Sequence, residues 1–455
     1  METAAVRNYG EAWEPAEAKG DSRTSARGVE ESLTGDKIPH GYVEMTFVKE
    51  TATGRGRNEK FIMEDLKNGT MKLTEGRIGI TVGRYKPRIS YRPISEWDMA
   101  YQSRVSKGYL ATSTHKMERV EVRKGGNGNG DGQNYAPVND PKVQSFIEEL
   151  MRYQKQMFDA SYTVKVDNIS DEMIALGEKI LKEIASGQDG MSLAEFNNKL
   201  KLLFAVIPRR MDKLSEHLAK HKADFAGIVA DEQDLFDIMV SQVRSAGGQK
   251  TSEKTALEAN GITMRQVTED EEGFIKKLLG NNAGKYVEAY RASNGKTEQD
   301  FSDFADIFGL GDGDGIAHLF HGTRNENVWS ILTTGLKNRP PKDAVITGKA
   351  YGMGTYFAPD AIKSLGYTSR IGSKWAGGTS SCGFLLICKV AVGTEDTWYD
   401  GHLGCDWFLN AEKLEQIAPG ALCTWAKSRY SGFRMDEVIV YQDAQSTVEY
   451  IVKMR

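Results

Sequence analysis

The sequence has few cysteines and no long apolar run, and each shortage excludes a class of protein. Its 455 residues include 4 cysteines, and none forms the C-x-x-C pairs typical of structural zinc sites or thioredoxin-like motifs. No apolar run approaches the roughly 18 to 20 residues that cross a bilayer. The opening residues, METAAVRNYG, lack the apolar core of a secretory signal. We expect an intracellular protein with reduced thiols, no metal and no membrane partner, nuclear in a eukaryotic host and cytoplasmic in a bacterial one.

The length of the chain exceeds what one hydrophobic core usually supports, which predicts several domains. Changes in composition divide the chain into six parts: a disordered tail (1–39), a small β-rich module (40–123), a Gly/Asn linker (124–136), a helical bundle (137–242), a polar linker (243–254) and an α+β domain (255–455). The predicted fold class is therefore multidomain α+β.

Charge is distributed unevenly along the chain, although the formal net charge is only −4. Residues 40–124 hold 17 Lys and Arg against 10 Asp and Glu, a net charge of +7. Residues 137–241 hold 13 against 18, a net charge of −5. A basic module on an acidic chain indicates a polyanionic partner for that module alone.

The basic module has the residue pattern of a small sheet. Strands are predicted at 41–48 and 60–63, and a strand pair over 69–83. A helix is expected over 97–105 and an extended segment over 108–112, and the short GRGR at 54–57 is interpreted as a loop.

The next segment has helical periodicity. Apolar residues recur at helical spacing in one stripe: Val143, Phe146, Ile147, Leu150 and Met151. A second helix begins after the N-cap candidate Ser170, and a third, over 193–207, is stopped by Pro208. His217 and His221, four residues apart, can share a helix face. Without a third ligand, a solvated face is favoured over a zinc site.

The last domain holds a polar triplet after a predicted strand at 317–320. Gly322 allows a ligand to approach the backbone and offers both N–H and C=O to a carboxamide, and Thr323 adds a hydroxyl. His321 can donate to a ribose hydroxyl or have a purely structural role.

Two tyrosines and a glutamate follow the triplet. Tyr356, in a strand, and Tyr367, in a helix beginning near Pro359, can sandwich an aromatic ligand, although core packing is the alternative for each. Glu437 precedes the apolar strand 438–441 and is either a turn residue or a catalytic carboxylate. Such a carboxylate can hold a ribose hydroxyl and stabilise an oxocarbenium-like centre.

In order and spacing, these residues resemble the H-Y-E triad of ADP-ribosyltransferases, and the chain from 255 to 455 is similar to poly(ADP-ribose) polymerases. The resemblance implies that NAD is the substrate. His321 would bind the adenosine-side ribose, Gly322 would pair with the nicotinamide amide, and Tyr367 would stack on the nicotinamide ring. Glu437 would be the catalytic glutamate that permits chain elongation. The further NAD-binding positions implied are Thr323, where many members have serine, Ser330, Lys337, where arginine is usual, Tyr356 as the triad tyrosine, and Ser364, which assists at the amide.

Upstream segments resemble the regulatory parts of DNA-dependent members. QSFIEELM, ISDEMIALGEKIL and LLFAVIP are similar to the helical subdomain that blocks NAD access until DNA binding loosens it. EGRIG at 75–79 resembles the W-G-R-x-G of WGR domains, which bind DNA ends. Glu75 replaces the tryptophan and its charge should repel phosphate, whereas Arg77 keeps its place and can hydrogen-bond a phosphate.

The function implied by the resemblance is transfer of ADP-ribose from NAD to protein acceptors, the enzyme included, with release of nicotinamide. DNA ends or nicks bound through 40–123 would stimulate it in a DNA damage response. Two alternatives stay open: a catalytically silent sensor of DNA ends and NAD, and a mono-ADP-ribosyltransferase.

Overall fold

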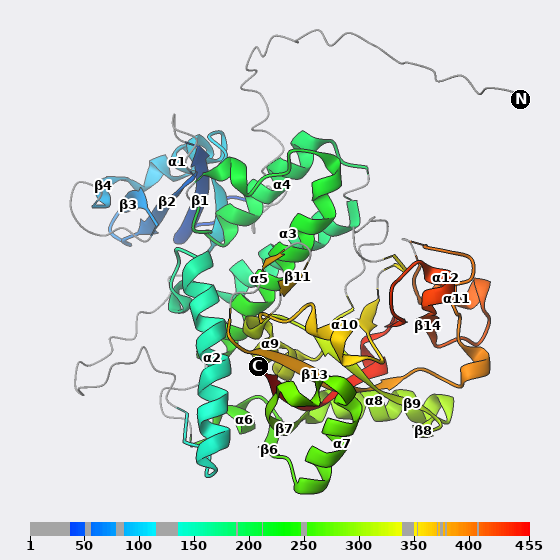
Figure 1. Cartoon of the computed structure of the whole chain (residues 1–455). Coiled ribbons are helices and arrows are strands. Elements are labelled where there is room, and N and C mark those ends of the chain that lie inside the picture. Colours follow the sequence, from blue (N-terminus) through cyan, green and yellow to red (C-terminus); the bar gives the residue numbers. More distant parts are fainter. Residues whose placement is uncertain are drawn as a thin grey trace, which may run out of the picture.

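The computed structural model describes residues 37–50, 56–78, 86–114, 135–187, 190–211, 213–246, 253–338, 350–352, 354–370, 372–373, 376–377, 380–406 and 409–455. These residues form an N-terminal sheet module, a set of helices and a C-terminal α+β body (Figure 1). Most of the predicted tail and of the Gly/Asn linker, and half of the predicted linker 243–254, lie outside the described residues. The first four residues of that second linker belong instead to helix α5 (Phe225–Ala246).

The N-terminal module is a five-stranded antiparallel sheet in the order β4-β3-β2-β1-β5. Its elements are β1 (Tyr42–Glu50), β2 (Gly56–Asp65), β3 (Thr70–Arg77), β4 (Arg88–Pro93), η3 (Ile94–Glu96), α1 (Trp97–Val105) and β5 (Leu110–Ser113). Alternating apolar residues such as Met45 and Met63 turn to one face and pack with Trp97 of α1 in a small core.

One sequence prediction fails in this module, and a second is only partly covered by the described residues. Gly56 and Arg57, expected in a loop, begin β2. Of the strand pair predicted over 69–83, β3 is described and residues 79–85 lie outside the described part. The partner strand on that side is β4, which had no alternating pattern to reveal it because nearly all of its residues are exposed.

The helical body contains α2 (Pro141–Ser161), α3 (Asp171–Gly187), α4 (Leu193–Val206) and α5 (Phe225–Ala246), with the short turns η4 (Val166–Asn168), η5 (Leu214–Glu216) and η6 (Lys222–Asp224). The predicted cap of α3 is confirmed: the Met173 N–H donates to Ser170 Oγ at 3.2 Å. His217 and His221 flank two separate 3₁₀ turns, so the shared helix face suggested by their spacing does not exist. No helix in the described ranges is long and apolar enough to cross a bilayer.

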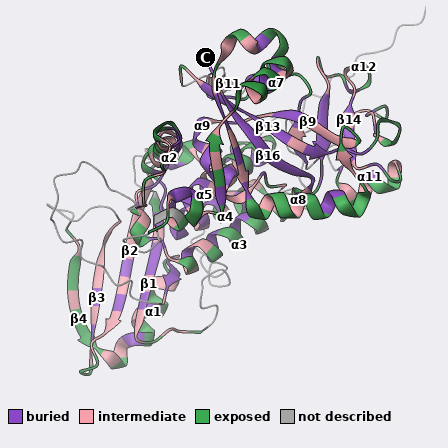
Figure 2. Cartoon of the chain, turned by 90° about the horizontal axis from the view of Figure 1, so that it is seen from below, coloured by how far each residue is buried: buried purple, intermediate pink, exposed green. Residues whose placement is uncertain are grey.

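The C-terminal body is built on a six-stranded sheet in the order β6-β7-β16-β13-β9-β8. Its strands are β6 (Ile262–Gln266), β7 (Tyr286–Asn294), β8 (Gly311–Asp312), β9 (Gly315–Gly322), β13 (Gly383–Ala391) and β16 (Ser446–Met454). They pair antiparallel, apart from the short β8–β9 pair. The central strand β13 is almost entirely buried (Figure 2), so this sheet is the rigid frame of the body.

A smaller sheet in the order β10-β15-β14 lies beside it. Its strands are β10 (Thr355–Phe357), β14 (Cys423–Ala426) and β15 (Glu437–Val440), and β11 (Gly372–Ser373) pairs with β12 (Ala376–Gly377). The helices are α6 (Ala256–Ala259), α7 (Glu269–Leu279), α8 (Gly295–Phe308), α9 (Asn325–Thr334), α10 (Ala361–Leu365), α11 (Ala411–Ile417) and α12 (Ser428–Ser431), with turns η7 (Gly280–Lys285), η8 (Glu395–Thr397) and η9 (Asp443–Gln445). This arrangement confirms the predicted mixture of helices and antiparallel sheets.

Helix α2 belongs to two hydrophobic cores. The ring of Phe146 stacks on Tyr290 of β7 with centroids 4.1 Å apart and meets Phe384 of β13 edge-on. One turn from its C-terminal end, Phe158 packs instead among the helices of the bundle. The apolar stripe predicted at 143–151 therefore faces the C-terminal sheet, and α2 joins the two bodies (Figure 1).

The N-terminal module contacts the helical body through three polar links. Thr46 Oγ1 donates to the Ala205 carbonyl at 2.5 Å, and Asn58 Nδ2 donates to the Arg209 carbonyl at 2.7 Å. Glu172 of α3 accepts hydrogen bonds from the end of β5 and from the residue after it. The bundle thus lies in contact with both the N-terminal module and the C-terminal body.

Candidate active site

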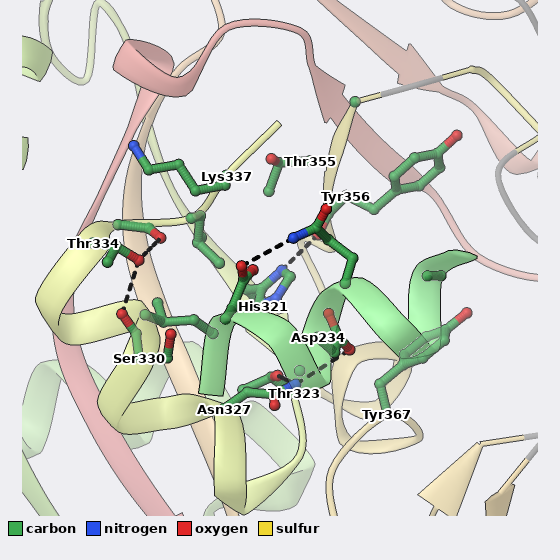
Figure 3. A pocket seen from close by; sticks show the side chains of 18 of the residues that line it. Asp234, His321, Thr323, Asn327, Ser330, Thr334, Lys337, Thr355, Tyr356 and Tyr367 are labelled. Carbon is green, nitrogen blue, oxygen red and sulfur yellow. Dashed lines mark hydrogen bonds between the residues drawn. The ribbon is translucent and has the colours of Figure 1, made fainter. Parts of the chain in front are cut away.

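A cavity of about 440 Å³ lies between the helical body and the C-terminal body (Figure 3). Such a volume suits a small-molecule ligand. Residues of α3 and α5 line one side, and β9, α9, β10 and the segment after α9 line the other. Seven of the residues predicted from the sequence meet on its wall: His321, Gly322, Thr323, Ser330, Lys337, Tyr356 and Tyr367.

His321 is oriented by the backbone of β10. Its Nδ1 lies 3.0 Å from the carbonyl oxygen of Tyr356. A carbonyl can only accept, so Nδ1 carries the proton and the neutral ring has Nε2 as an acceptor. In the neutral ring a ribose hydroxyl can therefore donate to Nε2, whereas a protonated ring donates from Nε2, the direction expected from the sequence.

Position 322 requires glycine because the backbone of Ser364 lies against it. A Cβ at this position would lie 1.8 Å from the carbonyl oxygen of Ser364, so the missing side chain makes room for α10, while the Gly322 backbone remains on the cavity wall. Ser364 is buried, and its Oγ donates to the Phe320 carbonyl at 2.9 Å. Among the described residues that line the cavity, Ser364 is absent. The hydroxyl predicted to assist at the amide thus ties α10 to β9 in this structure.

The two tyrosines occupy different environments. The Tyr356 hydroxyl donates to the Gly352 carbonyl at 2.9 Å and accepts from the Tyr351 N–H at 3.0 Å, which holds the ring in place. Tyr367 lies two residues beyond the end of α10, not within that helix as predicted, and is 49% exposed. Its accessible ring on the cavity wall can stack on a flat ligand.

Glu437 is the first residue of β15 and is only 6% exposed. Lys363 Nζ lies 2.6 Å from its Oε1. Burial raises the pKa of the Glu437 carboxyl, and the bond to Lys363 partly opposes that rise. Glu437 does not itself line the described cavity, but its negative charge adds to burial in raising the pKa of both Tyr356 and Tyr367. The carboxylate therefore lies near both rings.

Three contacting residues, Lys363, Phe433 and Asp443, had no signal in the sequence analysis. Lys363 pairs with Glu437, and its ammonium also lies 5.0 Å from the ring centroid of Phe433. Asp443 holds the ammonium of Lys337 at 3.2 Å. Only the position of Lys363, directly before Ser364, could have drawn attention to it; the other contacts join distant segments.

Asn327 and Asp234 link the two bodies across the cavity (Figure 3). Asn327 Nδ2 of α9 lies 3.4 Å from both Thr323 Oγ1 and Asp234 Oδ2 of α5. Asp237 of the same helix also lines the cavity. Helix α5 therefore places two carboxylates on the wall of a cavity that would hold an anionic dinucleotide.

Arg77 lies on β3 of the N-terminal module, outside the cavity lining. The adjacent Glu75 is paired with both terminal nitrogens of Arg104, at 3.0 and 3.1 Å. This bidentate pair offsets the charge that was expected to repel phosphate.

Comparison with known proteins places the C-terminal body in one family. Residues 285–455 match the poly(ADP-ribose) polymerase catalytic domain. A putative poly [ADP-ribose] polymerase-like protein, 100L, of Invertebrate iridescent virus 6 is 39% identical over 137 residues, which are 30% of this chain and 68% of the viral protein. Poly [ADP-ribose] polymerase 2-A of Oryza sativa subsp. japonica is 23% identical over 405 residues, 79% of this chain and 58% of the rice protein. The maize poly [ADP-ribose] polymerase 2 is 34% identical over 219 residues, 42% of this chain and 31% of its own length.

The matched catalytic domain makes the chain an NAD⁺ ADP-ribosyltransferase, an enzyme that uses NAD as its substrate. More narrowly, it belongs to the poly(ADP-ribose) polymerase family.

The first prediction concerns the close approach at Gly322. Gly322→Ala forces the new methyl group into the Ser364 carbonyl, so α10 must move and the site must distort. We expect loss of NAD turnover and a lower unfolding midpoint, measured by nicotinamide release and thermal denaturation. Gly284→Ala, where a Cβ meets nothing within 4 Å, is the matched control and should behave like the wild type. Normal turnover in Gly322→Ala would contradict the geometry.

The second prediction is a pH dependence set by Glu437. Because the pKa of Glu437 is raised, its ionised form predominates only above the pKa range that is ordinary for glutamate. We therefore expect kcat/KM for NAD to fall as the pH drops through the raised pKa. Lys363 stabilises the ionised form, so Lys363→Met should move this acid limb to higher pH. Lys276→Met, which removes an exposed lysine paired with Glu272, is the control. If the acid limb of the pH profile stays in place in Lys363→Met, Glu437 is not the group whose ionisation sets that limb.

Proposed function

We propose that this chain is a DNA-stimulated poly(ADP-ribose) polymerase that modifies protein acceptors, itself included, in a DNA damage response. The observation that carries the proposal is one cavity where His321, Tyr356 and Tyr367 meet beside the buried carboxylate of Glu437. The proposed parts are a WGR-like module (40–123), a regulatory helical subdomain (137–242) and a catalytic domain (255–455).

Each residue of the proposed site has a role suited to cleavage of the nicotinamide–ribose bond. The nicotinamide ring stacks on Tyr367, and the adenosine-side ribose donates to Nε2 of His321. As the glycosidic bond breaks, its electron pair leaves with nicotinamide and positive charge develops on the ribose. The ionised Glu437 stabilises that charge and accepts a hydrogen bond from the ribose.

The acceptor oxygen then forms the new bond to the ribose carbon as its O–H bond breaks, and Glu437, which polarises that nucleophile, accepts the proton. When the nucleophile is a hydroxyl of an ADP-ribose already attached, the chain grows. The Gly322 backbone pairs with the nicotinamide amide. Ser330, Thr323 and Lys337 complete the proposed NAD contacts, with Lys337 held by Asp443 and Ser364 acting through the position of α10.

The helical subdomain is proposed to inhibit the site. Helices α3 and α5 form one wall of the cavity, and Asp234 and Asp237 oppose the pyrophosphate of NAD by charge. Loosening the bundle would remove both the wall and the charges, and would leave α2 attached through Phe146 to the catalytic core.

A series of contacts connects the proposed DNA-binding module to the α5 wall of the cavity. The N-terminal module has a net charge of +7 over residues 40–124, and with Glu75 paired to Arg104, Arg77 is the proposed phosphate contact. Asn58 of the module donates to the Arg209 carbonyl, and the guanidinium of Arg209 forms a buried ion pair with Glu232 at 3.3 Å. Glu232 lies within the cavity-lining stretch of α5, directly before Gln233.

The third prediction tests the activity and its trigger. Purified protein incubated with labelled NAD should give a ladder of modified species that appears only with nicked or blunt-ended DNA. Glu437→Gln should bind NAD as the wild type does but form no ladder, because the neutral amide cannot stabilise the oxocarbenium-like centre. A ladder of equal strength without DNA would show that DNA does not stimulate the enzyme. A single shift would indicate mono-ADP-ribosylation, and no signal from the wild type would favour a silent sensor.

The fourth prediction tests inhibition by the bundle. Phe196 and Phe225 stack with centroids 3.8 Å apart in the bundle core, and Phe225→Ala should destabilise it by about 3 kcal/mol. NAD turnover without DNA should rise, measured by nicotinamide release. Phe301→Ala, which removes a buried phenylalanine from α8 of the catalytic body, is the matched control and should lower stability without raising turnover. Unchanged basal turnover in Phe225→Ala would refute the inhibitory role.

A further inference from the structure

A second hollow, of about 320 Å³, lies between α8, α11 and the chain that follows β15. Its apolar lining consists of Phe308, Ala411, Leu414, Ala421, Leu422 and Tyr441. None of these residues has a part in the proposed reaction, so the hollow, which we call the α8–α11 groove, needs its own explanation.

The surface beside the α8–α11 groove is unusually apolar for an exposed helix end. Phe308 is 47% exposed and Ile307, the residue before it, is 77% exposed. Single exposed apolar residues are ordinary, but two that adjoin an apolar hollow form a patch of the kind that marks a protein-binding surface. Figure 2 shows the exposed stretches of α8 facing outward.

The rim of the groove is negative. Glu412 and Glu415 line it, and no Lys, Arg or His does so within the described part of the chain. Lys413 of α11 lies between them in sequence, but its ammonium is held by Asp406 at 2.6 Å. Carboxylates at the rim of an apolar hollow favour a cationic segment with an apolar side chain, and they repel nucleic acid and anionic membranes.

The groove is connected to the active site through β15. Side chains alternate along extended chain, so Glu437 and Ile439 share one face of β15, and Tyr441, the residue after the strand, continues that face. Tyr441 follows Glu437 by four positions, a span of about 13 Å. The Tyr441 hydroxyl donates to the Tyr351 carbonyl at 3.0 Å, and the Tyr351 N–H donates to the Tyr356 hydroxyl. The floor of the groove is thus two hydrogen-bonded steps from the site tyrosine.

We propose that the α8–α11 groove is an exosite that docks a basic segment of the protein acceptor, with one apolar side chain inserted between Phe308 and Leu414. The inference rests on the proposed transfer to protein acceptors. Docking there would raise the local concentration of acceptor at the catalytic body without touching NAD.

The first experiment measures docking without NAD, so that its failure is distinct from a failure of the proposed activity. The probe is a short fluorescent peptide of Lys and Gly with one central Leu, and its twin carries Ser in place of Leu. Fluorescence anisotropy with the full-length protein should show tighter binding of the Leu peptide. Glu412→Lys should weaken that binding roughly threefold to tenfold, because an exposed attraction becomes a repulsion.

Two further variants complete the test. Asp270→Lys, an equal charge change on exposed α7, is the matched control and should bind the Leu peptide like the wild type. Phe308→Ser should abolish the preference for Leu over Ser. A kinetic measurement uses the same peptide with an acidic or neutral acceptor residue added, in the presence of NAD. Glu412→Lys should raise KM for this peptide. Without peptide, its NAD hydrolysis should stay at the wild-type level.

Three outcomes would overturn the exosite. Equal loss of binding in Glu412→Lys and Asp270→Lys would mean unspecific attraction to net charge. Equal affinity for the Leu and Ser peptides would mean that the apolar lining is unused. Concentration-dependent self-association that disappears in Phe308→Ser, seen by sedimentation, would assign the groove to a second copy of the chain instead.

Discussion

One backbone crossing between β9 and β10 holds the candidate site together. Phe320 and Ala358 exchange both of their backbone hydrogen bonds at 2.9 Å. The same Phe320 carbonyl accepts from Ser364 Oγ, and the Tyr356 carbonyl accepts from His321 Nδ1. These bonds bring the histidine, the first tyrosine and the helix before Tyr367 to one place. Helix α10 can approach β9 this closely because Gly322 has no side chain where the backbone of Ser364 passes.

The helical body is positioned to couple distant parts because it shares a core or a polar contact with each neighbour. Helix α2 places Phe146 in the catalytic core and Phe158 in the bundle core, so the two bodies cannot separate without exposing apolar surface. Helix α5 has a different attachment, with polar residues over the cavity and the buried Arg209–Glu232 pair behind it. Because α2 is shared by both cores, the proposed loosening of the rest of the bundle would leave it attached to the catalytic body.

Local patterns predicted local structure well. The stripe around Phe146, the cap at Ser170 and the stop at Pro208 each appear where the sequence placed them, because helical spacing, capping and proline act within a few residues. Strand β4 was missed because an edge strand with exposed residues has no alternating pattern. The packing need for glycine at position 322 was not foreseen because the neighbouring carbonyl, that of Ser364, is forty-two residues further along the chain.

The sequence by itself determined the chemical groups, their order and the elements that carry them: a histidine at the end of one strand, a tyrosine in another, and a glutamate at the head of a third. Only the tertiary structure decided what those groups meet. It set Lys363 on Glu437, Asp234 across the cavity from Thr323, and the stripe of α2 against the catalytic sheet. The physical reason is that periodicity states which face of an element is apolar or charged, whereas the partner of that face depends on how distant segments pack.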